Sequence, residues 1–252
     1  MAALSVVIIT LNEERNIGRC LESVKSLADE MVVVDSLSMD GTKSIALSHG
    51  AKVIEQPFLG YIEQKNFALD HAAHDYVLSL DADEALDEKL IHSILLLKQE
   101  GFSHDGYTMN RCSNYAGKWI RHGTWYPDRK LRLMNRKKAR WGGINPHDKI
   151  MMDKRSTIMH LRGDILHFSY YSLDEQLAQM NRFTSIQAKS MLEAGKKASF
   201  LNLVINPLVA FVTGYFFKGG FLDGVDGFII ARSVSYQTFL KYAKLMHLRN
   251  SG

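Results

Sequence analysis

Residues 4–100 alternate between short runs of β-branched residues and segments with helical spacing, and no other feature of the sequence limits the fold as strongly. The run LSVVII is followed by NEERNIGRCLESVKSLA, in which one face recurs at helical intervals: Ile17, Cys20, Leu21, Val24 and Leu27. MVVVD, a helix from about Thr42, AKVIEQ, a helix across YIEQKNFALDHAA and DYVLSL complete a βαβαβαβ order. This order predicts an α/β fold with a mostly parallel sheet and helices on both faces.

The rest of the chain divides into a strand-like segment and a helical tail. A helix from about Asp87 closes the first half, and residues 106–170 carry short strand-like pieces such as GYTMN, KLRLM and ILHFSY. A long helix is predicted from Ser172, with Glu175 three residues on as in a capping box. We therefore expect one domain over residues 1–170, with halves 1–105 and 106–170, and a helical region over 171–252.

The tail carries a long apolar stretch, FLNLVINPLVAFVTGYFF, at residues 200–217. It is about long enough to cross a bilayer, but Asn202, Asn206, Pro207 and Gly214 interrupt it. The next segment, KGGFLDGVDGFIIARSVSYQTFLKYAKL, mixes large apolar residues with Lys and Arg. Helices lying on a membrane surface are the favoured interpretation, while a helical pair packed on the domain and a true span stay open.

Net charge, the distribution of basic residues and cysteine content indicate what kind of partner and compartment to expect. The 252 residues include 31 Lys and Arg against 27 Asp and Glu, a net charge of +4, which is too small to argue for nucleic acid. Basic residues gather within 111–140 and in the tail, which indicates an anionic acceptor, an anionic membrane surface or a solvated basic face. Two cysteines and the start MAALSVVIITLNEERN, which lacks a basic segment, favour a cytoplasmic location.

Acidic side chains follow an apolar strand in YVLSLDADEALDEKL, residues 76–90. Asp81 and Asp83 are two residues apart where this strand ends, so they can share a hard cation. The alternative is a helix start with Asp83 or Asp87 as its N-cap. TLNEE and DSLSMDGT follow two other strands at the same predicted edge, where open α/β sheets bind their ligands, although capped turns would also explain them.

Four segments in order, SVVIITLNEERNIGRCLESV, VVVDSLSMDGT, EQKNFAL and LSLDADE, resemble the amino-terminal half of family-2 glycosyltransferases, inverting enzymes with the GT-A fold. KWIRHGTWYPDRKLRLMNR, GDILHFSY and GFLDGVDGF resemble the lipopolysaccharide core-region subgroup, so the resemblance covers nearly the whole chain. It implies a Rossmann-like GT-A domain with a membrane-associating helical extension. Residues 1–105 would bind the nucleotide sugar and residues 106–170 the acceptor.

The resemblance also implies roles for individual residues. Asp83 would bind Mg²⁺ or Mn²⁺, and His167 could complete the metal shell, unless it is a buried His bonded to backbone. The residues implied to contact the nucleotide sugar are Thr10, Asn12, Glu14, Asp35, Ser38, Asp40, Gln64, Lys65, Asn66 and Asp81.

The candidate catalytic base is Asp148, in NPHDKI, because inversion needs one carboxylate to take a proton from the acceptor hydroxyl. Family members usually carry His-Glu here, so Asp148 shortens the acid, and a surface turn after Pro146 is the alternative. The predicted acceptor-binding cluster offers rings for sugar faces and a guanidinium for phosphate, although a packed turn would also explain it. Its members are Trp125, Tyr126, Asp128 and Arg129.

Together these features imply an inverting glycosyltransferase that moves a sugar from a nucleotide sugar, with a UDP-sugar expected, to a lipid-linked glycan such as the lipopolysaccharide core. We expect it in the cytoplasm, attached peripherally to the anionic inner face of the cell membrane. Two alternatives remain. One is an aspartate-nucleophile phosphatase, since LSLDADE also delivers a D-x-D from an apolar strand. The other is a non-catalytic nucleotide-sugar-binding membrane protein.

Overall fold

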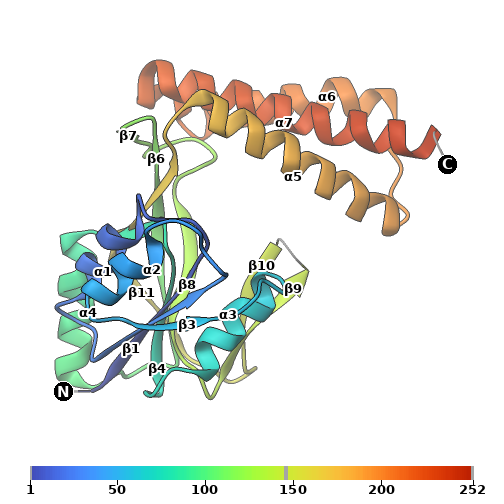
Figure 1. Cartoon of the computed structure of the whole chain (residues 1–252). Helices are drawn as coiled ribbons and strands as arrows, with labels where there is room; N and C mark the ends of the chain where they lie inside the picture. The colour runs from blue at the N-terminus through green and yellow to red at the C-terminus, as the bar shows by residue number, and fades with distance from the viewer. Residues whose placement is uncertain (1, 145–146, 251–252) are drawn as a thin grey trace. The chain divides into compact units, whose positions relative to one another are not determined.

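A mixed sheet organises the part of the chain that the computed structural model describes, residues 2–144 and 147–250. Within those residues the sheet has nine strands in the order β3-β2-β1-β4-β8-β6-β11-β5, with β7 paired to β6 (Figure 1). The chain forms two compact units. Unit 1 comprises Met1–Arg111 and Asp128–Phe168, and unit 2 comprises Cys112–Pro127 and Ser169–Gly252. Residues 112–127 therefore group with the carboxyl-terminal helices.

The predicted parallel sheet is present in the first half of the chain. β1 (Leu4–Thr10), β2 (Glu30–Asp35), β3 (Lys52–Glu55) and β4 (Tyr76–Asp81) pair in parallel. Thr10 lies opposite Asp35 on β2, and Ile9 lies opposite Asp81 on β4. The carboxyl ends of three strands thus meet at one edge, where the polar motifs follow them.

The second half extends this sheet with longer strands than the sequence indicates. β8 (Asp128–Asn135) pairs antiparallel with both β4 and β6 (Gly106–Tyr115), and β11 (Ile158–Tyr170) pairs antiparallel with β5 (Glu84–Leu86). The short β7 (Lys118–Trp119) joins β6, while β9 (Ala139–Ile144) and β10 (His147–Met152) form a separate ladder. Polar residues such as Arg111 and Asn114 interrupt the apolar pattern of β6, which hides its length.

Helices cover both faces of the sheet, as the strand composition predicts. α1 (Ile17–Val24), α2 (Thr42–Ser48) and α4 (Glu88–Glu100) pack on one face, where they share a core with Leu4, Val6 and Ile8 of β1. α3 (Tyr61–Asp70) packs on the other face with Val7, Val34 and Trp141. Successive residues of β1 thus enter opposite cores, because side chains alternate along a strand.

A close contact fixes β11 against the start of α4. Asp87 caps α4 by accepting a hydrogen bond from the Leu90 amide at 2.7 Å, and its own amide donates to the Asp164 carbonyl at 3.1 Å. Gly163 has φ +103°, and a Cβ there would lie 2.2 Å from the Leu90 nitrogen. Only glycine permits this approach, which positions the segment of β11 that carries His167.

Unit 2 consists mainly of helices. α5 (Leu173–Glu193) begins at the predicted cap, where Ser172 Oγ accepts from the Glu175 amide at 3.2 Å. α6 (Phe200–Val212) runs into the π-helical turn η1 (Thr213–Phe217), and η2 (Gly220–Asp223) leads into α7 (Gly224–Asn250). The buried Asp223 carboxylate accepts from the His122 amide at 2.9 Å and ties the 112–127 segment to these helices.

We expect Gly163→Ala to lower the free energy of unfolding by about 2–4 kcal/mol, because a left-handed conformation and a backbone clash add together. Gly101→Ala is the matched control, since Gly101 also has positive φ, +79°, but nothing lies within 4 Å of its Cβ position. The control should lose only about 1–2 kcal/mol. Urea denaturation of both variants measures the difference, and equal losses would contradict the proposed contact.

Candidate active site

The turns after β1 and β2 hold each other at the edge of the sheet. The Asn12 amide donates to Ser38 Oγ at 2.8 Å, and Asn12 Oδ1 accepts from the Met39 amide at 2.9 Å. One turn further on, the Glu14 amide donates to Asp40 Oδ2 at 3.1 Å, and Glu14 Oε2 accepts from the Gly41 amide. The structure therefore brings together four of the predicted nucleotide-contacting residues from two separate motifs.

Two predicted carboxylates support these turns from within. Asp35 is fully buried and accepts from both the amide and the hydroxyl of Ser38. Asp40 accepts from the Thr42 amide at 3.0 Å where the chain enters α2, so the capped turn that the sequence left open is present. Burial alone would raise the pKa of Asp40, but hydrogen bonds from Thr42 and Glu14 lower it.

Buried polar atoms without a partner lie beside this edge. Gln64, on α3, donates from Nε2 to Ser36 Oγ at 3.0 Å and to the Gln56 carbonyl at 3.1 Å. Within the described residues, Gln64 Oε1 and Thr10 Oγ1 are buried and have no hydrogen-bond partner. Such atoms are uncommon in folded proteins, and a bound ligand can satisfy them.

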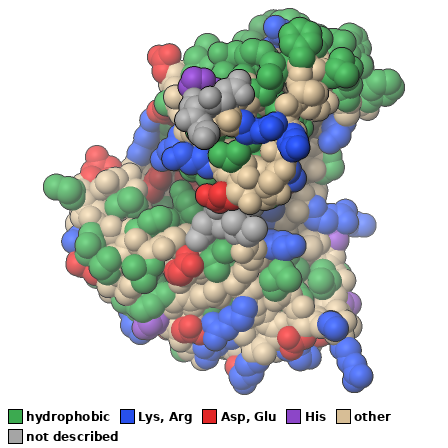
Figure 2. Space-filling view, turned by 90° about the vertical axis from the view of Figure 1, so that its right-hand side faces the viewer, with side chains coloured by type: hydrophobic (Ala, Val, Ile, Leu, Met, Phe, Trp, Pro, Cys, Tyr) green, Lys and Arg blue, Asp and Glu red, His purple; other side chains and the backbone are tan. Residues whose placement is uncertain are grey.

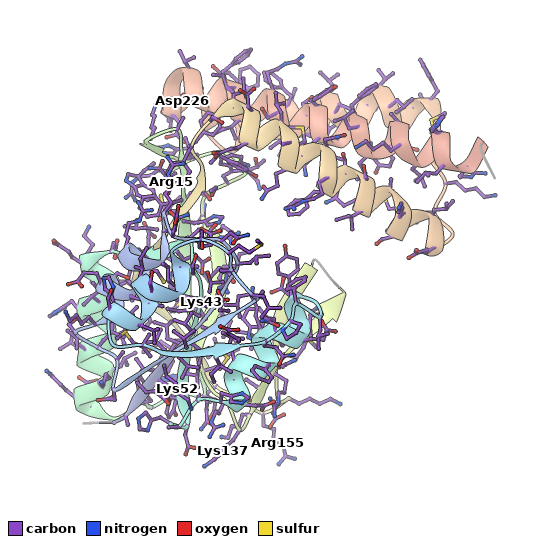
Figure 3. The ribbon with its side chains drawn as sticks, in the orientation of Figure 1. Arg15, Lys43, Lys52, Lys137, Arg155 and Asp226 are labelled. Atoms are coloured by element: carbon purple, nitrogen blue, oxygen red, sulfur yellow. The ribbon has the colours of Figure 1, made fainter. Side chains whose placement is uncertain are left out.

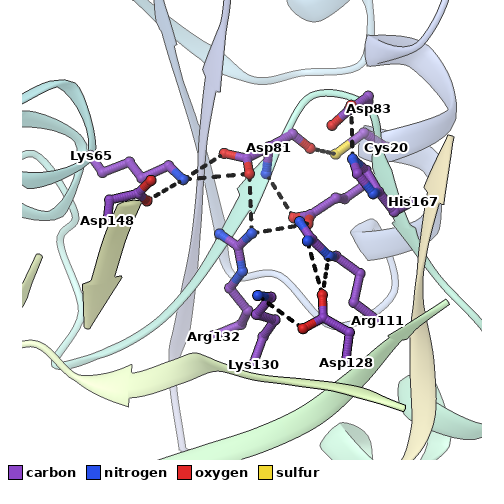
Figure 4. Close-up of polar contacts among 11 residues, drawn as sticks. Cys20, Lys65, Asp81, Asp83, Arg111, Asp128, Lys130, Arg132, Asp148 and His167 are labelled. Carbon is purple, nitrogen blue, oxygen red and sulfur yellow. Dashed lines mark hydrogen bonds and ion pairs between the residues drawn. The ribbon is translucent and has the colours of Figure 1, made fainter. Parts of the chain in front are cut away.

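An alternating chain of charges passes through the strand ends (Figure 4). Lys65 Nζ lies 3.0 Å from Asp81 and 2.8 Å from Asp148. Arg132, on β8, lies 3.1 Å from the other oxygen of Asp81 and 2.9 Å from Glu84. Beyond Glu84 the alternation continues through Arg111, Asp128 and Lys130.

The buried members of this chain keep opposite charges. Burial alone would raise the pKa of Asp81, but Lys65 and Arg132 outweigh it and hold that pKa well below its usual range. Burial alone would lower the pKa of Arg132, but Glu84 and Asp81 raise it. No role was predicted for Arg132, Arg111 or Glu84. For Arg132 the available signal is a charge inside an otherwise apolar strand, KLRLM, and for Glu84 it is the acidic run DADE.

Asp83 and His167 meet beside this network. β11 pairs with β5 so that His167 lies opposite Glu84, and the Phe168 amide donates to the Asp83 carbonyl at 2.9 Å. Asp83 Oδ2 and His167 Nε2 are then 3.2 Å apart, with side chains 28% and 20% exposed. No group of three His, Cys, Asp or Glu that could hold a metal occurs among residues 2–144 and 147–250. Asp83 and His167 are therefore a pair, and they could supply at most two protein ligands from these side chains.

Glu13 is an acid near this pair that the sequence analysis did not single out. Burial raises the pKa of Glu13, and the charges of Asp83, Asp40 and Asp81 raise it further, while a hydrogen bond from Asn16 opposes them. The sequence hint for Glu13 was the adjacent pair of glutamates in TLNEE, because either of the two acids could face the neighbouring carboxylates. Negative charge therefore concentrates at this edge, as a cation site requires.

The predicted base, Asp148, lies on β10 and faces α3. The side-chain amide of Asn66 donates to the Trp141 carbonyl at 2.9 Å and accepts from the Trp141 amide at 3.0 Å, which fixes β9 against α3. β10 pairs with β9 and so brings Asp148 to Lys65. The alternative of a surface turn after Pro146 is not what the structure shows at Asp148, which lies within a strand; residues 145 and 146 themselves lie outside the described residues.

The predicted acceptor cluster is divided between the two units. Trp125 and Tyr126 belong to unit 2, where the Trp125 ring packs 6.0 Å from Tyr115 and 5.7 Å from Tyr170 between centroids. The packed-turn alternative is therefore present for Trp125. Asp128 and Arg129 belong to unit 1: Asp128 pairs with Arg111 at 2.9 Å, and Arg129 is exposed.

A cavity of about 580 Å³ on unit 1 has a different lining from this site. Four of the ten residues that line it are basic. Lys137 lies at the opposite end of the sheet from Arg15, which follows β1 (Figure 3). Lys137 and Lys138 are paired with Asp75 and Asp105. The charges around this cavity are therefore largely compensated within the protein.

The lowered pKa of Asp81 predicts an acid-sensitive contribution to stability. The ionised carboxylate stabilises the fold above its unfolded pKa, about 3.9, and this contribution is lost as pH falls below that value. We expect the unfolding free energy of Asp81→Asn, measured in urea from pH 7 to pH 3, to fall less steeply on acidification than that of the unchanged protein. Glu88→Gln, at an exposed acid, should follow the unchanged protein. Identical slopes for Asp81→Asn and the unchanged protein would contradict the assignment.

Comparisons with known proteins identify the family of this chain. The family model described as Glycosyl transferase family 2 matches residues 5–158. An uncharacterized glycosyltransferase of Rickettsia typhi is 34% identical over 98% of this chain and 88% of its own length. The lipopolysaccharide core biosynthesis glycosyltransferase LpsC of Rhizobium meliloti is 32% identical over 96% of this chain and 91% of its own length.

A solved structure is also similar over part of the chain. Glucosyl-3-phosphoglycerate synthase from Mycobacterium tuberculosis, in complex with Mn²⁺, UDP and phosphoglyceric acid, is 26% identical with a TM-score of 0.37, over 46% of this chain and 44% of that one. The family match and the two relatives give no support to the phosphatase alternative. They confirm the predicted GT-A fold and glycosyltransferase class, and the chain belongs to glycosyl transferase family 2.

Proposed function

We propose that this protein is an inverting glycosyltransferase that transfers a sugar from a nucleotide sugar to a lipid-linked glycan such as the lipopolysaccharide core, at the cytoplasmic face of the membrane. One observation carries the proposal: Lys65 joins the strand-end carboxylate Asp81 to the candidate base Asp148 within unit 1. The carboxylates expected at the donor and the base that would act on the acceptor thus belong to one connected cluster. A UDP-sugar is the first donor to test, because the resemblance implies it.

The edge formed by β1, β2 and α3 suits the nucleotide. Thr10 Oγ1 and Gln64 Oε1 are buried and unpaired within the described residues, so hydroxyl or amide groups of a nucleoside could satisfy them. Asn12, Glu14, Asp35, Ser38 and Asp40 would shape the two turns around it. Asn66 would support the site indirectly: its side-chain amide holds Trp141 and thereby orders the strand next to the one that carries Asp148.

Asp83 and His167 would hold Mg²⁺ or Mn²⁺. A carboxylate oxygen and an imidazole nitrogen 3.2 Å apart, both partly exposed, are a ligand pair that could share a divalent ion. When bound, such an ion neutralises charge that develops on the departing diphosphate.

Asp148 would act as the general base. It would take the proton from the acceptor hydroxyl as that oxygen attacks the anomeric carbon, while the diphosphate leaves from the opposite face. In the structure, the Lys65 ammonium holds Asp148 at 2.8 Å. A donor diphosphate near Lys65 would compete for the same ammonium, so donor binding would leave Asp148 freer to accept a proton.

The acceptor assignment is supported by chemistry and by a relative. LpsC is named for lipopolysaccharide core biosynthesis, and it aligns with 96% of this chain. Arg129 is exposed on β8 beside the charged network, where a guanidinium can bind a phosphate with two hydrogen bonds. We therefore expect an acceptor that combines sugar with phosphate. Transfer to purified core lipid precursors, with the stereochemistry of the new bond determined by NMR, tests both the acceptor and the inversion.

We expect Asp83→Asn to lower metal-dependent donor turnover by about 100-fold or more. The reason is that the metal ion proposed to neutralise the leaving diphosphate would lose a protein carboxylate that holds it. The assay is release of nucleoside diphosphate from a panel of UDP-, GDP- and ADP-sugars with and without Mn²⁺. Glu88→Gln, the same change at an exposed acid of α4, is the control and should keep full activity. Unchanged Mn²⁺-dependent turnover in Asp83→Asn would exclude Asp83 as a metal ligand.

Asp148→Asn separates catalysis from donor binding. We expect it to slow sugar transfer by about 10²–10⁴-fold, the usual contribution of a general base, and to leave the Kd of UDP with Mn²⁺ within a few-fold of the original. Calorimetric titration and single-turnover transfer measure the two quantities. If transfer is retained, the base is another residue. If UDP binding is lost as well, Asp148 belongs to the donor site instead.

A further inference from the structure

α6 exposes apolar side chains along its outer surface. Two neighbouring rows recur at intervals of four residues: Phe200, Val204 and Leu208, and beside them Leu201, Ile205 and Val209. All six are between 47% and 72% exposed. A stripe at this spacing normally faces a protein core.

Pro207 marks the side of α6 that faces the protein. It is buried, and its carbonyl accepts from Ser235 Oγ of α7 at 2.8 Å. Asn202 Oδ1 accepts from the Ser199 amide at the helix start, and Asn206 is half-buried, so neither makes the exposed side of α6 polar. The side turned away from α7 is therefore apolar, whereas a helix on the surface of a soluble protein places polar residues there.

The exposed apolar surface continues beyond α6 into the next three elements. Phe216 and Phe217 of η1, Phe221 and Leu222 of η2, and Val225 and Phe228 of α7 are between 45% and 82% exposed. We call these six side chains and the six of α6 the apolar face. Figure 2 shows hydrophobic side chains gathered over the helices of unit 2, with Lys and Arg among and beside them. A patch of this size on a soluble protein indicates an interaction surface.

The charge of unit 2 identifies the kind of partner. Its sequence holds eleven Lys and Arg against five Asp and Glu, whereas unit 1 has twenty against twenty-two. Lys218 directly follows the exposed Phe217, and the Arg232 guanidinium lies 5.7 Å from the Phe211 ring centroid. Cations beside large apolar side chains match the boundary between anionic headgroups and acyl chains.

The packing of α6 determines how it would meet a bilayer. Phe200–Phe217 meets the length and composition of a membrane span and is 6% buried, but at about 1.5 Å per residue it covers only about 27 Å. It also lies along α7, which carries Asp226, Arg232, Lys241 and Lys244. Lys244 in turn donates to Asn181 and Thr184 of α5. A spanning α6 would draw these charged and polar neighbours into hydrocarbon, which is strongly unfavourable.

We propose that the apolar face lies flat in the interfacial region of an anionic membrane, with α6 parallel to the bilayer plane rather than across it. This inference rests on the membrane location in the proposed function and deepens it by naming the surface, its orientation and the lipid charge. It predicts stronger binding to vesicles that contain phosphatidylglycerol than to phosphatidylcholine vesicles, with the difference reduced by salt.

The first test is co-sedimentation of the full chain with vesicles of both compositions. We expect Leu208→Asp to lower the partition coefficient on anionic vesicles by about tenfold or more, because it places a charge at the centre of the apolar face. Leu96→Asp on α4 of unit 1 is the matched control, since Leu96 is also an exposed leucine on a helix, and it should bind as the unchanged protein does. Equal binding by the two variants would overturn the proposal.

The second test measures depth. Cys20 and Cys112 are buried and free, so single cysteines introduced at Leu201, Ile205 and Val209 can be labelled selectively with a fluorophore. Quenching by lipids with nitroxides at different depths should place all three labels at one shallow depth. Labels that lie progressively deeper along α6 would indicate a span and contradict the flat orientation. Burial of the labels in a lipid-free dimer would instead assign the face to a second copy of the chain.

The outcome can be separated from that of the proposed function. UDP binding with Mn²⁺ and donor hydrolysis, measured in solution on Leu208→Asp, should match those of the unchanged protein. If vesicle binding fails while these activities persist, the surface assignment is wrong and the glycosyltransferase proposal stands. If vesicle binding holds while neither UDP binding nor donor hydrolysis occurs, the surface assignment stands and the glycosyltransferase proposal is wrong.

Discussion

The site depends on one buried guanidinium. Arg132 is 4% exposed and lies between Glu84, which is 1% exposed, and Asp81 at the end of β4. An uncompensated charge at this depth would be strongly destabilising, so the guanidinium needs both carboxylates near it. Glu84 also accepts from the Asp81 amide at 3.0 Å, which fixes the backbone of the turn that carries Asp83. A structural ion pair thus sets the geometry of the candidate site carboxylates Asp81 and Asp83.

The same charges join parts of the chain that are distant in sequence. Arg132 comes from β8 and Lys65 from α3, while Asp81 comes from β4 and Asp148 from the β9–β10 ladder. Each cation serves two acids, so moving one acid changes the balance of the others. Under the proposed function, this coupling would link donor and acceptor chemistry, because a diphosphate that engaged Lys65 would alter the environment of Asp81 and Asp148 together.

Local patterns predicted the parallel half of the fold and the residues at its edge. The apolar strands, the cap at Ser172 and the placement of Asp81 and Asp83 at a strand end follow from spacing and turn chemistry, which are local in sequence. The partners of those acids do not. From the sequence alone, Arg111 and Arg132 look like ordinary polar positions of strands, and their contacts with the acids depend on the pairing of β8 with β4 and β6. Likewise, no periodicity in the sequence indicates that Trp125 packs with Tyr170 of unit 2. Contacts between distant segments decide these features.

In the proposed mechanism, Asp83 and His167 would bind a divalent ion together with the donor diphosphate. Anomalous scattering from crystals grown with Mn²⁺ and UDP is the most direct test of this metal site. We expect a manganese peak within coordination distance of Asp83 Oδ2, His167 Nε2 and two phosphate oxygens, with Lys65 turned towards the diphosphate. A manganese peak elsewhere, or UDP bound with Asp83 directed away from its phosphates, would show that this pair is not the metal site.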